Sequence, residues 1–268
     1  MKPSIGRSAA NPAIVWAVII AVVFQIGASA LPAFGIGDPI GSQSNAVRTL
    51  ITPAGWAFAI WGPLYAGSVV FAIYQALPAQ KARALPARIR LPAAGAFFAN
   101  GLWALYTQFN GLAVFSVPII LFGLSCLIAI YRVFARWQPP FSTGERWCAV
   151  LPLSALAAWL TAAAIVNIAA TLLFYGVGAG DPAPLVSALV VLTGGIIASL
   201  AIARGRGNPI YAAVFLWALS AIYAAGGQQA EPVAIAAGVA AVLVIIGTAI
   251  GLRAGGLKRW FGGAAAGM

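Results

Sequence analysis

The chain has no histidine and only four acidic residues among its 268 positions. A Ser-His-Asp triad and an HExxH zinc motif both require histidine, so neither can be present. The four acids are scattered along the chain, which also excludes paired carboxylates that would hold a metal ion. We therefore expect no enzymatic activity and no metal or other cofactor. None of the acids lies well inside an apolar span, which argues against a transporter that relays protons through intramembrane carboxylates.

Cysteine is almost as scarce, with Cys126 and Cys148 the only two in the chain. Cys126 lies within an apolar stretch and Cys148 lies at the start of the next one. Neither is predicted to reach the oxidising side of a membrane. We expect small buried thiols rather than a structural disulfide.

Charge of any kind is rare, because charged residues make up 7% of the chain and hydrophobic residues make up 62%. Soluble domains carry roughly a quarter charged residues, so lipid must be the main solvent. A helix crosses the hydrocarbon core with roughly 20 apolar residues and satisfies its backbone hydrogen bonds internally. The sequence therefore predicts an all-α integral membrane protein with about eight transmembrane helices. The predicted spans are residues 12–33, 56–77, 92–109, 113–135, 148–175, 184–203, 209–225 and 232–252.

The few positive charges are distributed unevenly around these spans. Fourteen of the fifteen Lys and Arg residues lie in the two tails or in the gaps after spans two, four and six. The alternate gaps contain only Arg48, together with Asp38, Asp181 and Glu231. This positive-inside pattern predicts that both termini are cytoplasmic. Because topology accounts for the net charge of +11, we expect the lipid bilayer, and no nucleic acid, as the partner of these charges.

The first span has a second interpretation. Lys2 and Arg7 precede it, and it ends near Ala28-Ser29-Ala30, which resembles a signal-peptidase site. Cleavage there would leave seven spans and the same charge pattern. The apolar stretch is long for a signal peptide and Gln25 interrupts it, so we favour an uncleaved first helix.

The spans that remain informative carry tryptophan and amide side chains. In span two, Trp61 and Tyr65 share one helical face, and Pro63 between them should kink the helix. Span three carries Asn100 and Trp103, span five carries Trp159 and Asn167, and span one carries Gln25. Buried amides need partners, so these side chains either bond one another to fix helix packing or orient a ligand in a cavity. Both interpretations stay open on these residues, and the number of deep tryptophans favours the cavity.

These pieces are similar, in order and spacing, to a known family. Thr52-Pro53-Ala54-Gly55-Trp56 followed by Trp61-Gly62-Pro63-Leu64-Tyr65 resembles the start of helix two in the translocator protein/tryptophan-rich sensory protein (TspO/MBR) family. Asn100-Gly101-Leu102-Trp103 resembles its Asn-Trp-x-Trp motif in helix three, with Gly101 in place of the first Trp. Trp159 followed by Asn167 resembles its helix five. The chain departs from the pattern by continuing with three more apolar spans.

The resemblance implies a TspO-like five-helix membrane domain over residues 1–176, with an additional three-helix membrane segment over residues 177–268 packed on it. It further implies a pocket for porphyrins, sterols and related flat molecules, covered by a lid loop over residues 34–55 that contains Asp38 and Arg48. We add Tyr65 to the predicted ligand-binding residues because it shares a helical face with Trp61. The predicted ligand-binding residues are Trp56, Trp61, Tyr65, Asn100, Trp103, Trp159 and Asn167.

Three functions remain open at this point. The leading prediction is a non-enzymatic, tryptophan-rich sensory or translocator-like protein that binds a tetrapyrrole, a sterol or an isoprenoid-like molecule, in a bacterial inner membrane. The alternative is a membrane permease for a small or lipophilic solute that is not proton-coupled through intramembrane carboxylates. A membrane enzyme would have to rely on loop residues such as Asp38, Arg48 or Asp181.

A homodimer is a further expectation, because two small-residue patches would let helices approach closely. One consists of Gly95 and Ala99 in span three, and the other of Gly247 and Gly251 in span eight. The family often dimerises through helix three, whereas such patches serve packing within one chain at least as often.

Overall fold

The structure is a computed structural model that describes residues 11–261, so Lys2 and Arg7 lie outside the described residues. The described part is all-helical, as the sequence predicts. The long helices are α1 (Pro12–Ala30), α3 (Trp61–Ala76), α4 (Ala84–Asn110), α5 (Ser116–Arg136), α7 (Leu151–Phe174), α8 (Ala183–Arg204), α9 (Pro209–Ala225) and α10 (Glu231–Gly251). The short helices are α2 (Ile40–Ala46), α6 (Thr143–Glu145) and α11 (Leu257–Trp260). The 3₁₀ and π turns are η1 (Leu31–Phe34), η2 (Gly55–Ile60), η3 (Pro78–Gln80), η4 (Arg146–Val150), η5 (Gly226–Gln228) and η6 (Leu252–Gly256).

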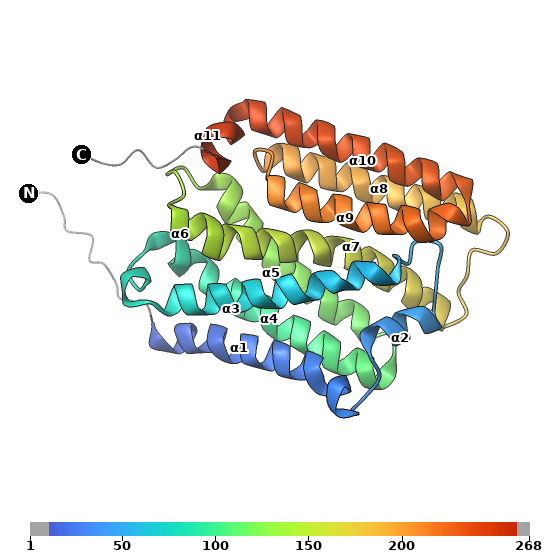
Figure 1. The fold of residues 1–268 in the computed structure, drawn as a ribbon, viewed down its shortest axis with the longest axis horizontal. Coiled ribbons are helices and arrows are strands. Elements are labelled where there is room, and N and C mark those ends of the chain that lie inside the picture. Colours follow the sequence, from blue (N-terminus) through green and yellow to red (C-terminus); the bar gives the residue numbers. More distant parts are fainter. Residues whose placement is uncertain (1–10, 262–268) are drawn as a thin grey trace, which may run out of the picture.

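The long helices run side by side in one elongated bundle (Figure 1). In that view α1, α3 and α4 lie on one side, α8, α9 and α10 lie on the other, and α7 runs between the two groups. Helix α7 packs against α3, α5 and α9, and α8 packs mainly against α10. The central position of α7 agrees with its sequence, which is rich in alanine and whose Trp159 and Asn167 side chains are both buried.

Seven of the described helical segments are long and apolar enough to cross a membrane. Helix α4 is not among them, although it is 27 residues long and packs between α1 and α5. Its buried face includes the polar side chains of Arg90, Asn100 and Gln108, which lower its hydropathy. The predicted fold class, an all-α integral membrane protein, is confirmed.

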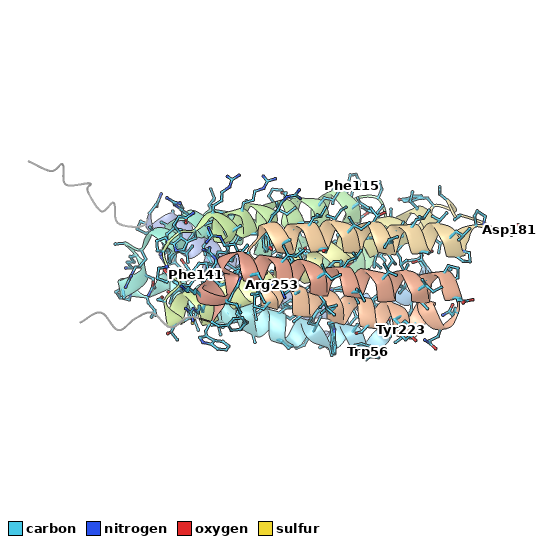
Figure 2. All side chains as sticks on the ribbon, turned by 90° about the horizontal axis from the view of Figure 1, so that it is seen from above. Trp56, Phe115, Phe141, Asp181, Tyr223 and Arg253 are labelled. Carbon is cyan, nitrogen blue, oxygen red and sulfur yellow. The ribbon has the colours of Figure 1, made fainter. Side chains whose placement is uncertain are left out.

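The two ends of the bundle differ in charge. Figure 2 shows Asp181 at one end of the bundle and Arg253 in the opposite half. Helix α1 begins, and α11 lies, at the same end of the bundle (Figure 1). The two ends of the described chain meet at one end of the bundle because eight long helices, including α4, run along it in alternating directions.

The structure extends one predicted span and contradicts one local prediction. Helix α4 begins at Ala84, before the predicted apolar span over residues 92–109, and accommodates Pro92 inside the helix. Pro63 does not kink a continuous helix, because it lies in the first turn of α3, directly after the 3₁₀ turn η2. Proline is tolerated in the first turn, where its missing N–H would have had no helical partner.

Both small-residue patches are used inside the chain. A Cβ on Gly95 would lie 2.9 Å from the Cys126 sulfur, and a Cβ on Gly123 would lie 3.2 Å from that of Ala99, so the first patch packs α4 on α5. A Cβ on Gly247 would lie 2.5 Å from the Ser199 carbonyl oxygen, so the second patch packs α10 on α8. Neither patch is therefore open to a second copy of the chain.

Candidate functional site

A cavity lies between α4, α7 and α9 and is covered at one end by α2 and by the segment that leads into η2. Its wall is almost entirely apolar, and its free volume is about 50 Å³. That volume holds a few water molecules, whereas sites for drug-sized ligands measure roughly 300–1,000 Å³. The cavity in this structure is therefore too small for a ligand of that size. The lining residues are Ile40, Ser44, Pro53, Phe58, Trp103, Leu112, Trp159, Ala162, Ala163, Val166, Asn167, Ala218 and Ile222.

Trp103 and Asn167 form the polar part of the wall. The indole N–H of Trp103 donates to Asn167 Oδ1 at 2.9 Å. The amide nitrogen of Asn167 donates in turn to the hydroxyls of Ser116 at 2.8 Å and Thr171 at 3.3 Å. Asn167 is only 2% exposed. Two of these bonds use both of its N–H donors, and the third uses its oxygen. The amide therefore links α4, α5 and α7 as well as facing the cavity.

Trp159 forms the aromatic part of the wall together with Phe58, whose ring meets it edge-on with centroids 6.3 Å apart. Behind Trp159, the ring of Trp61 also meets it edge-on at 6.0 Å and stacks on Tyr65 at 5.4 Å. The stack confirms that Trp61 and Tyr65 share one helical face. Tyr65 donates its hydroxyl to Ser29 at 2.7 Å and so ties α3 to α1. Trp61 and Tyr65 thus support the wall without lining the cavity.

Asn100 and Trp56, two more of the predicted ligand-binding residues, lie away from the cavity, as does Gln25. Asn100 is buried, and its amide nitrogen has no hydrogen-bond partner. Gln25 bonds to Ser68 at 3.1 Å rather than to either asparagine. Trp56 is 46% exposed and meets the ring of Trp217 edge-on at 4.7 Å, on the outside of the bundle. Neither Asn100 nor Trp56 lines the cavity in this structure. Their contacts with a ligand stay predictions.

The predicted lid is ordered around α2. Asp38 accepts a hydrogen bond from Gln43 at 3.2 Å, and Arg48 donates to Asn45 at 2.9 Å. Asp38 and Arg48 are both exposed. In the part of the chain that the structure describes, Asp38 and Arg48 therefore bond to neutral side chains and do not pair with each other.

The sequence analysis missed the contribution of α9. Ala218 and Ile222, which close the cavity on that side, belong to α9. Small and aliphatic residues at helical spacing are typical of any packed helix, so no signal in the sequence marked them. Phe58, next to the recognised tryptophans, was also missed, whereas Pro53 belongs to the predicted lid loop over residues 34–55. Within residues 11–261, no group of three His, Cys, Asp or Glu side chains is placed to hold a metal ion.

A comparison with protein-family models tests the resemblance. The model of the family described as TSPO-like protein matches residues 12–250. The chain belongs to this family. The match includes α8 and α9 and all but the last residue of α10, so it extends beyond the five helices that carried the resemblance. No curated protein and no solved structure matched the chain.

Proposed function

We propose that this membrane protein binds a flat hydrophobic ligand, such as a tetrapyrrole, a sterol or an isoprenoid-like molecule, in the cavity between α4, α7 and α9. The observation that carries the proposal is the composition of the wall, in which two indoles and one phenyl ring surround a single amide. Rigid aromatic surfaces with a few polar groups are typical of small-molecule sites. Membership in the TSPO-like protein family supports the same conclusion.

The chemistry of the wall favours binding over catalysis. Trp103, Trp159 and Phe58 offer ring faces and edges, which stabilise a flat ligand by stacking and by burial of apolar surface. Asn167 is already bonded to three neighbours, so it orients the Trp103 ring rather than acting as an acid or a base. We place the protein in the inner membrane of a bacterium, where such a ligand would enter from the lipid phase.

The test is quenching of tryptophan fluorescence by protoporphyrin IX, using the purified protein with Trp103→Phe and Trp159→Phe variants. Saturable quenching, with an affinity that falls in both variants, is the expected result. Trp147→Phe is the matched control, because Trp147 is 63% exposed and lies outside the cavity. Equal affinities in all four proteins would rule out this cavity as the site. Saturable transport of the ligand into sealed vesicles would instead support a permease.

A further inference from the structure

The cavity is closed on one side by residues that precede α3. Pro53 and Phe58 lie in its wall, and both belong to the segment over residues 47–60, which links α2 to α3. Because the free volume of about 50 Å³ is several times too small for a drug-sized ligand, part of the wall must move before a ligand enters. The long helices α4, α7 and α9 each pack against other helices, whereas the segment is a connection between helices, so we take the segment as the part of the wall that moves.

Two hydrogen bonds join the segment to α9, whereas Phe58 also contacts the Trp159 ring of α7. The backbone N–H of Ala54 donates to the carbonyl oxygen of Ala221 at 3.0 Å. The indole N–H of Trp217 donates to the carbonyl oxygen of Ala57 at 3.2 Å. Trp217 also contacts the ring of Trp56 edge-on. Figure 2 shows Trp56 toward the same end of the bundle as Tyr223 of α9.

A fourth contact lies just past the end of α9, at Gly226. A Cβ on this residue would lie 1.7 Å from the carbonyl oxygen of Leu50, so only glycine allows the segment to approach this closely. The φ of Gly226 is −67°, which any residue adopts. Space for Leu50, and not backbone conformation, is therefore what requires glycine at this position.

We propose that α9 holds the segment 47–60 shut through these contacts, which we call the clasp, and that release of the clasp admits the ligand. Trp217 and Gly226 are then positioning residues for a site that the last three helices complete. This inference rests on the proposed function. It assigns a role to α9, whose side chains Ala218 and Ile222 face the cavity beside the clasp.

The experiment measures how fast protoporphyrin IX binds and leaves, by stopped-flow tryptophan quenching. Trp217→Phe keeps an aromatic ring but removes the N–H, and Gly226→Ala displaces Leu50. Loss of one hydrogen bond raises the open fraction about two- to tenfold. We expect the association and dissociation rate constants to rise together by that factor in each variant, with little change in Kd, because both steps pass through the open state.

The matched control is Trp260→Phe. Trp260 also donates its indole N–H to a backbone carbonyl, that of Arg206 at 2.7 Å, but it does so near the other end of the bundle. This control should leave both rate constants unchanged. Rate constants unchanged in Trp217→Phe and Gly226→Ala would overturn the proposal, as would a change in Kd that comes from dissociation alone.

A ligand-free measurement separates this inference from the proposed function. Hydrogen–deuterium exchange should become faster across residues 47–60 in Trp217→Phe and Gly226→Ala, and stay unchanged in α5. Faster exchange in a protein that does not bind porphyrin would support the clasp and refute the assigned ligand. Unchanged exchange in both variants would refute the clasp itself.

Discussion

Trp103 of α4 and Asn167 of α7 are joined by a hydrogen bond of 2.9 Å between buried side chains that are 64 residues apart in the sequence. The bond fixes the orientation of an indole that lines the cavity, and it uses the only acceptor of the amide. One pair therefore serves both purposes that the sequence left open, since it links two helices and shapes the site.

Removing this bond should cost both stability and affinity. Trp103→Phe leaves Asn167 Oδ1 buried without its donor, at a cost of about 1 kcal/mol, since side-chain hydrogen bonds between membrane helices average roughly 0.6 kcal/mol. Thermal unfolding in detergent should show a small decrease in Tm. The double variant Trp103→Phe/Asn167→Ala should lose less than the sum of the two single variants. Strict additivity would show that the pair is not coupled.

Filling the cavity should weaken binding without unfolding the protein. Ala218→Val adds two methyl groups at a buried position of α9 that lines the cavity. The added groups fit the free volume of about 50 Å³, and they take up space that the ligand needs once the wall has moved. We expect Tm within a few degrees of the parent protein and at least a tenfold weaker protoporphyrin affinity. Ala213→Val, at an exposed position of the same helix, is the control.

Arg90 should be the most stabilising of the basic residues in α4. It is 2% exposed, and it donates to the side chain and backbone of Gln75 at 2.9 Å and to the carbonyl of Gln80 at 2.8 Å. Arg90→Leu leaves these acceptors without their donor, so we expect a loss of about 2–4 kcal/mol. Equilibrium unfolding in detergent measures it. Arg132→Leu, at an exposed site, should change stability little, and an equal loss in both would contradict this role.

The pairing of α8 with α10 should depend on Gly195. A Cβ at this position would lie 2.4 Å from the Cβ of Ala240 and 2.9 Å from its Cα, so the two helices could not keep their distance. Gly195→Leu should destabilise the protein by about 1–3 kcal/mol or more. Gly238→Leu is the control, because a Cβ there meets no atom within 4 Å. Similar melting temperatures in the two variants would show that the close contact is not required.

Much of the helical arrangement could be predicted because hydropathy and charge act locally. The apolar spans and the alternating basic gaps can be found from short stretches of sequence alone. Each predicted span corresponds to a long helix. The starting point of α4 could not be predicted, because the apolar span over residues 92–109 does not include the polar first turns of the helix. Tertiary contacts with Gln75 and Gln80 make the longer helix stable.

The candidate site was only partly accessible to the same reasoning. Trp103, Trp159 and Asn167 line the cavity, and a tryptophan or an amide inside a membrane stands out in a sequence. Ala218 and Ile222 line it equally, but their residue types occur throughout the spans. Trp56 and Asn100 are as conspicuous as Trp103, yet they lie elsewhere because side-chain direction depends on how each helix is rotated in the bundle.

The sequence by itself determined that this protein is an all-α membrane protein with tryptophan-rich helices, because lipid is the only solvent that suits 62% hydrophobic and 7% charged residues. Only the tertiary structure decided which of those residues meet. It joined Trp103 to Asn167, and it brought α9 against the segment before α3 through Trp217 and Gly226. The physical reason is that helix formation and membrane insertion depend on local composition. Contacts between residues about 160 positions apart, such as Ala57 and Trp217, depend on how the helices pack.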